Sequence, residues 1–177
     1  SGTLDFTGGC SMANVSNPGA QRLRPGANLT LLGSTFTNDG TLDVGEPGAL
    51  AGAYLRPGSH VVVQGTGEIR LRDAAQSVFD SPGGWSVTQS TGHAIRGAGF
   101  VTAPLVNHGD LRADVAGSQL QLIGNHANDG TMRATDGGQL WLASVGLANT
   151  GGQVLASGGD VTLQNTSITG GTLSAAA

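Results

Sequence analysis

Residues 107–114 read NHGDLRAD, and related stretches recur as NDGTMRAT at residues 128–135 and NTGGQVLA at residues 149–156. The Asn that opens each stretch returns with a constant 21-residue period, at Asn107, Asn128 and Asn149. The same interval separates Asn17 from Asn38, in SNPGAQ and TNDGTL. A fixed interval with little else held constant is typical of a structural repeat whose copies stack on one another.

Inside each repeat the sequence indicates short strands joined by turns. SQLQLI, GQLWLAS and DVTLQNTSI alternate apolar residues with polar or small ones, which is the period of a strand with one buried face. NDG, NHG, DGG and PGG are turn signals, because Asn, Asp and Gly tolerate a positive φ. Only residues 73–79, in the longest run without Gly, are compatible with a short helix.

The 21-residue interval suits three short strands and three turns, which together make one closed coil. A single coil cannot bury its own inner face, but stacked coils can, with neighbouring coils pairing as parallel strands about 4.8 Å apart. Residues one period apart then lie directly above one another. We therefore predict that Asn107, Asn128 and Asn149 form a ladder at a turn, each amide bonding to the backbone or to the next Asn.

These observations predict the fold class: all-β, a single-stranded parallel β-helix (β-solenoid) with about 21 residues per coil. A right-handed coil is inferred from this class, because the hexapeptide repeat of left-handed versions is missing. We expect one domain over residues 1–177, with roughly six to eight coils. A second repeat has a longer interval: LRPGANLTL, which begins at Leu23, recurs as LRPGSHVVV, which begins at Leu55. It indicates either coils with longer loops or matching elements that are out of phase.

Composition narrows the classes of function. The net charge is −4, and all eight basic residues are Arg, so the chain lacks the basic footprint of a nucleic-acid-binding protein. No stretch approaches the ~20 apolar residues of a membrane helix, so membrane insertion of this segment is not expected. The four His have no spacing typical of a zinc site, and no phosphate loop or dinucleotide fingerprint stands out. We therefore expect no metal and no cofactor.

One histidine is predicted to be structural. His126 falls in a column with Leu105, Leu147 and Ile168, which follow one another with the period of the Asn residues. The other members of this column are apolar. His126 is therefore expected to be partly buried, with its ring nitrogens hydrogen-bonded.

The repeat pattern that begins with GAGFVTAPLVNHGDLRA, at residues 97–113, resembles the sequences of the parallel β-helix stalks of bacterial surface and secreted proteins. These include autotransporter passengers and filamentous haemagglutinin-type exoproteins. The resemblance covers most of residues 17–173 and is strongest after Gly97. It implies a protein that is extracellular or on the bacterial cell surface. Such regions serve as rods, adhesins or scaffolds. The abrupt start SGTL and the end LSAAA, which is a poor cap for a solenoid, lead us to expect a fragment of a longer protein, joined to other domains of the same chain.

Four residues are candidates for contact with a ligand. Trp141 is predicted to face outward because the leucines beside it face inward, and aromatic faces stack on sugar rings and on partner proteins; otherwise it covers a turn. Arg112 and Arg133 are predicted to stack in one column, neutralised by nearby Asp or binding an anionic polysaccharide. Trp85 lies in the irregular segment 79–90, which is a lid, a binding loop or an insertion. The expected partner is a glycan or a protein on a host or neighbouring cell.

An enzyme is the alternative, because parallel β-helices include pectate-lyase-like polysaccharide lyases and hydrolases. Such enzymes need an acid and a base in reach of one another. The candidate groups are Asp110 and Asp114 on either side of Arg112, Asp43 and Glu46 at a turn, and His93 with Arg96. None of these groups stands out from ordinary solvated residues, so we predict no catalytic residue. The expected function is instead that of a non-catalytic segment that presents a long face to glycans or partner proteins.

Overall fold

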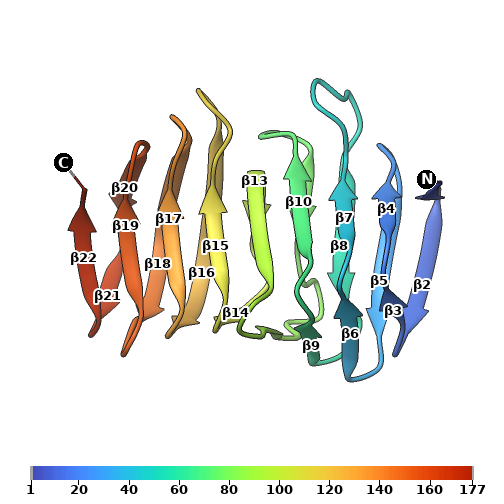
Figure 1. Cartoon of the computed structure of the whole chain (residues 1–177), viewed down its shortest axis with the longest axis horizontal. Helices are drawn as coiled ribbons and strands as arrows, with labels where there is room; N and C mark the ends of the chain where they lie inside the picture. Colours follow the sequence, from blue (N-terminus) through green and yellow to red (C-terminus); the bar gives the residue numbers. More distant parts are fainter. Residues whose placement is uncertain (1, 177) are drawn as a thin grey trace.

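The structure, a computed structural model that describes residues 2–176, is all-β in that range, with 22 strands and no helix. The strands stack in parallel as about eight coils with a repeat of about 21 residues, which confirms the predicted β-solenoid. Figure 1 shows the coils side by side along the long axis of the molecule, with the N-terminal coil at one end and the C-terminal coil at the other.

Each coil contributes strands to three faces, as the repeat interval predicts. Face 1 consists of β1 (Thr3–Phe6), β4 (Ala20–Leu23), β7 (Thr41–Val44), β10 (Glu68–Arg72), the first half of β13 (Ala94–Val101), β15 (Asp110–Ala113), β17 (Thr131–Ala134), β19 (Gln153–Ala156) and β22 (Thr172–Ala175). Coils are numbered 1 to 8 by the face 1 strand that begins each of them, from β1 to β19.

The other two faces complete each coil. Face 2 consists of β2 (Gly9–Ala13), β5 (Asn28–Leu32), β8 (Ala53–Pro57), β11 (Ser77–Phe79), the second half of β13, the first halves of β16 (Gln119–Asn128) and β18 (Gln139–Ala148), and β20 (Asp160–Gln164). Face 3 consists of β3 (Ser16–Asn17), β6 (Thr35–Asn38), β9 (Val61–Gln64), β12 (Val87–Gln89), β14 (Leu105–Asn107), the second halves of β16 and β18, and β21 (Ser167–Thr169).

The length of a coil varies because its turns vary, whereas its strands stay in register. The coil from Thr41 to its partner Glu68 is long, and the coil from Ala94 to its partner Asp110 is much shorter. The long coil contains the loop 45–52, which projects at the top of Figure 1. The short coil has none there, since β13 runs from face 1 into face 2 without a turn.

The two LRPG stretches do not occupy equivalent positions in their coils. Leu55, which begins the second stretch, pairs with Leu29 rather than with Leu23, which begins the first. Of the two interpretations that the sequence left open, matching elements out of phase is therefore the one that the register supports.

The core is a set of stacked aliphatic columns inside the coils. In the inner column of face 1, every side chain from coil 3 to coil 8 is at most 2% exposed. Burying such side chains stabilises the fold by about 25 cal/mol per Å² of apolar surface. Each coil thus depends on its neighbours for burial. The column is Leu42, Ile69, Ile95, Leu111, Met132 and Val154.

The Asn residues form buried ladders, all oriented in the same direction. Asn107 Nδ2 donates to Asn128 Oδ1 at 2.6 Å, and Asn128 Nδ2 donates to Asn149 Oδ1 at 2.7 Å. In the N-terminal coils Asn17 donates to Asn38 in the same way at 2.7 Å. Each amide within a ladder therefore offers a donor to the next coil and an acceptor to the previous one, which satisfies polar atoms in an otherwise apolar interior.

Two different side chains bridge the gap between these ladders. Gln89 takes the position opposite Asn107 in the adjacent coil, and its Nε2 donates to Asp110 O at 3.1 Å, as Asn107 Nδ2 does to Thr131 O. The imidazole of His93 lies against Asn38, with 3.0 Å between Nε2 and Nδ2. His93 is 1% exposed, so it is a structural residue of the interior.

The short helix considered for residues 73–79 does not form. Ser77 N–H donates to Asp73 O and closes one helical turn, while Asp73 Oδ1 accepts from the N–H groups of Ala75 and Gln76. The turn goes no further because Ser77 pairs with Ala53 as the first residue of β11. The helical signal in the sequence therefore comes from a capped turn between two strands.

Replacing Asn128 by Ala should lower the free energy of unfolding by about 3 kcal/mol, because it leaves buried polar atoms of Asn107 and Asn149 without their partner. Urea unfolding followed by circular dichroism measures the change. Asn125→Ala is the matched control, since Asn125 is exposed on the same strand and should change stability by less than about 0.5 kcal/mol. Equal effects of the two substitutions would contradict the ladder.

Candidate functional site

Face 1 carries a central outward column that is rich in arginine. From coil 4 to coil 7 the residues in register are all Arg, about 4.8 Å apart from one strand to the next. Stacked guanidinium groups repel one another unless carboxylates lie close by. The column reads Asp5, Arg22, Asp43, Arg70, Arg96, Arg112 and Arg133.

Carboxylates from the two flanking columns neutralise these arginines. Glu68 pairs with Arg70 and with Arg96, at 2.5 Å from the latter. Asp114, whose side chain is only 7% exposed, lies 2.5 Å from Arg96 and 3.2 Å from Arg112. The arrangement is a continuous network of ion pairs along face 1.

Asp110 closes the network at its C-terminal end. It accepts two hydrogen bonds from Arg133, from Nε at 2.9 Å and from Nη2 at 2.8 Å, and lies 3.9 Å from Arg112. Arg112 and Arg133 thus stack in one column with Asp neighbours, which is the geometry expected from their spacing. Asp110 and Asp114, considered as an acid–base pair, both lie against arginines.

The electrostatics of the network favour fixed charges. Burial raises the pKa of Glu68, but the hydrogen bond from Arg70 and the charge of Arg96 outweigh burial and lower the pKa below its usual value. Burial likewise opposes the charge on Arg96, yet Asp114 and Glu68 raise the pKa of this guanidinium. Glu68 and Arg96 therefore remain ionised at neutral pH, and neither is poised to exchange a proton.

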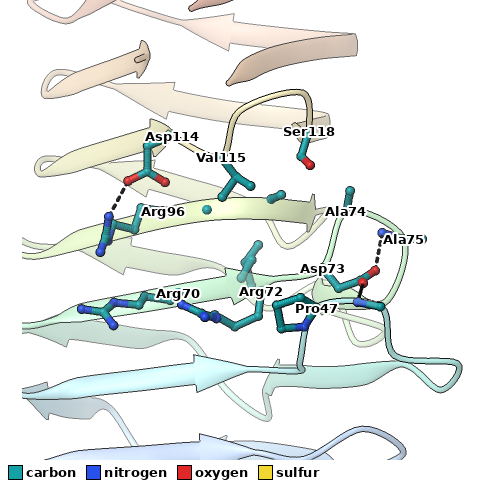
Figure 2. Close-up of a pocket in the computed structure, with 14 residues that line it drawn as sticks. Pro47, Arg70, Arg72, Asp73, Ala74, Ala75, Arg96, Asp114, Val115 and Ser118 are labelled. Carbon is teal, nitrogen blue, oxygen red and sulfur yellow. Dashed lines mark hydrogen bonds and ion pairs between the residues drawn. The ribbon is translucent and has the colours of Figure 1, made fainter. Parts of the chain in front are cut away.

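A pocket of about 430 Å³ lies at the edge of face 1 where it turns into face 2. Its floor is Gly97 and Ala98 of β13, the coil that lacks a turn, and loops of the neighbouring coils form its walls. Figure 2 shows Arg96 and Asp114 at one side and Pro47 and Asp73 at the other. The pocket is a direct result of one short coil between coils with longer loops.

The two carboxylates of this pocket are occupied by structural contacts. Asp73 accepts hydrogen bonds from three backbone N–H groups, those of Gly48, Ala75 and Gln76, at 2.7 to 3.0 Å. Asp114 is held by two guanidinium groups. His93 does not join Arg96 at this pocket, because its ring is buried against Asn38. The fold therefore separates His93 from Arg96, whereas Asp110 and Asp114 stay on either side of Arg112.

Face 2 carries a different outward column, which is uncharged and partly aromatic. Trp141 belongs to it, facing outward between buried Leu140 and Leu142, as the alternation predicts. The aromatic members Tyr54, Phe100 and Trp141 lie in coils 3, 5 and 7, and all are partly exposed. The column reads Gly9, Asn28, Tyr54, Val78, Phe100, Gln121, Trp141 and Thr162.

The surroundings of this column are polar but nearly neutral. Arg56 pairs with Asp80 at 2.8 Å, and its guanidinium lies 4.6 Å from the centre of the Tyr54 ring. On the other side of the column, Gln119 and Gln139 lie next to each other in adjacent coils. The indole Nε1 of Trp141 is covered and has no partner among the described residues, so the exposed part of its ring is carbon. The column can therefore make apolar contacts flanked by amides.

Trp85 lies elsewhere, in the loop between β11 and β12. It is 39% exposed and packs edge-on against His60, with 5.1 Å between ring centroids. His60 also contacts the hydroxyl of Ser86 at 2.7 Å, so two contacts attach the loop to the neighbouring coil. Trp85 and Trp141 are three coils apart and do not form one site.

No candidate metal centre is found among residues 2–176, where no group of three or more His, Cys, Asp or Glu side chains is placed to hold an ion. Within the same residues no helix has the length and apolarity needed to cross a membrane. Comparisons of the chain with protein-family models, with curated proteins and with solved structures give no match.

Two buried histidines stay neutral in the folded protein. Burial lowers the pKa of His93 to about 4, although the charge of Glu68 opposes this. Burial also lowers the pKa of His126 to about 4, against a hydrogen bond to the backbone of Ile123. Leu105 N–H donates to His126 Nδ1 at 3.3 Å, which is the satisfied, buried histidine that the sequence predicts.

These two residues should make the protein sensitive to acid. The unfolded chain binds protons on histidine below about pH 6.5, whereas the folded chain does not until about pH 4. The free energy of unfolding should therefore be independent of them above pH 6.5 and fall between pH 6.5 and 4, by on the order of 3 kcal/mol for each histidine. Urea unfolding across this range measures the slope. His126→Leu should reduce it, and an unchanged slope in that variant would contradict the assignment.

Proposed function

We propose that this chain is a non-catalytic rod segment of a secreted or cell-surface bacterial protein, which presents a long outer face to glycans or to proteins of other cells. The observation that carries the proposal is the uncharged aromatic column of face 2. It repeats along the axis of the solenoid and offers apolar ring surface to solvent. The likeness of the repeats to bacterial surface stalks supports the location.

The interior suits a mechanical role. Apolar columns and Asn ladders make each coil depend on its neighbours, so the stack resists local opening. The ion-pair network on face 1 ties coils 4 to 7 together on the outside. Networks of this kind stabilise more than isolated surface pairs do. These features support a rod that holds its binding face in a fixed geometry.

A polysaccharide lyase or hydrolase is the second candidate, and the pocket over Gly97 and Ala98 favours it. It has the volume of a small-ligand site, and Arg70, Arg72 and Arg96 line it. Against catalysis, Asp73 and Asp114 are held in place by backbone amides and guanidinium groups. A catalytic carboxylate must instead reach the substrate or hold a proton at working pH.

Incubation with neutral and acidic polysaccharides should distinguish the two candidates. We expect retention of the protein on at least one polysaccharide column, with no new reducing ends and no unsaturated products. Asp114→Asn should lower the free energy of unfolding by roughly 2 kcal/mol and leave retention unchanged, because it breaks two ion pairs without touching face 2. Chain cleavage that disappears in this variant would overturn the proposal in favour of the enzyme.

A further inference from the structure

The aromatic residues of face 2 recur at every second coil. Tyr54 pairs in register with Val78, which pairs with Phe100. Phe100 pairs with Gln121, which pairs with Trp141. Since neighbouring strands are about 4.8 Å apart, the backbone positions of the three aromatic residues lie roughly 9.6 Å apart along the solenoid axis.

This spacing matches the repeat of a β-1,4-linked polysaccharide. In such a chain each sugar is turned over relative to the next, so every second sugar presents the same face, and the disaccharide repeats over nearly the distance of two coils. One sugar would therefore lie opposite each coil. The rings of Tyr54, Phe100 and Trp141 would meet the C–H faces of alternate sugars, and Val78 and Gln121 would lie under the sugars between them.

The charge of the face indicates a neutral polymer. Arg56 and Asp80 neutralise each other beside the column, and the column itself has no ionised residue. Gln121 lies in the column and can offer its amide to sugar hydroxyls, whereas beside the column the Gln139 amide already donates to Thr162 Oγ1 at 3.0 Å and Gln119 Oε1 is covered. An acidic polymer would gain little here, because Arg56 is paired with Asp80 and the carboxylate of Asp160 lies in the column next to that of Trp141 and Thr162.

Resting on the proposed function, we infer that face 2 binds an unbranched, uncharged β-1,4-linked polysaccharide laid along the solenoid axis, with Tyr54, Phe100 and Trp141 as its stacking platforms. Recognition is by spacing: α-1,4-linked and β-1,3-linked glucans, which coil as helices, do not return the same sugar face to every second coil. The ligand class is a glucan or an N-acetylglucosamine polymer of this linkage, and no deep pocket is required.

The first test measures linkage preference. In a Trp85→Phe background Trp141 is the single tryptophan, so its fluorescence reports on face 2 alone. Titration with cellohexaose and with chitohexaose separates the two polymer types. Maltohexaose, laminarihexaose and hexagalacturonate serve as α-1,4-linked, β-1,3-linked and acidic comparisons. Calorimetry should give at least about tenfold tighter binding of a neutral β-1,4-linked hexamer than of the comparisons.

The second test measures the spacing itself. Phe100→Ala and Trp141→Gln should each weaken binding by about tenfold, because each removes one platform. Exchanging two residues, Gln121→Trp with Trp141→Gln, keeps the composition but moves the indole one coil closer to Phe100. This exchange should weaken binding as much as Trp141→Gln alone. Thermal unfolding of each variant checks that it is folded.

The outcomes distinguish failure of the spacing inference from failure of the proposed function. Binding that ignores linkage, or that survives the exchange of Gln121 and Trp141, overturns the spacing inference and leaves a glycan-binding rod. Binding of hexagalacturonate alone also overturns it and points to face 1 instead. Absence of binding to any hexamer overturns the inference as well. Cleavage of a hexamer overturns the proposed non-catalytic function.

Discussion

The stacking of each strand on its equivalent in the next coil, about 4.8 Å away, is the constraint on which the rest of the structure depends. It places each side chain next to the side chain at the same position of the neighbouring coil. Identical residues can therefore follow one another in a column only where their side chains do not repel each other. Aliphatic side chains meet this condition by simple contact, and amides meet it because each carries both a donor and an acceptor. Guanidinium groups do not, and the arginine column of face 1 is found only with carboxylates in the columns beside it.

The irregular coils are where this rule is relaxed. Between coil 2 and coil 5 the Asn ladder is interrupted, and Gln89 and His93 fill the interior with side chains that each leave a buried polar atom unpaired. The same coils carry the longest loop and the missing turn, which together create the pocket over Gly97. Departures from the repeat therefore interrupt the amide ladder and open solvent-accessible volume in one part of the rod, while the coils after Asn107 stay regular.

The parts of the fold that can be predicted from sequence are those that the repeat imposes directly. The interval from Asn107 to Asn128 and Asn149 is enough to indicate coils, three faces and an amide ladder, and alternation places Trp141 outward. The aromatic column could not be foreseen, because loops of different length change the sequence intervals between Tyr54, Phe100 and Trp141. For the same reason Arg70 and Arg96 could not be recognised as members of the column of Arg112. Register in three dimensions is regular where the sequence count is not.

A solenoid of this kind separates two tasks that a globular domain combines. Its interior fixes the distance between coils, and this distance then applies equally to every outward column, whatever residues occupy it. A column is consequently a linear array with a set pitch, and a polymer whose own repeat is commensurate with that pitch meets equivalent contacts at each step. Weak single contacts then add along the array, and affinity grows with the number of coils engaged rather than with the depth of any one site. Selectivity between polymers can arise from pitch alone, which an extended surface provides and a single pocket does not.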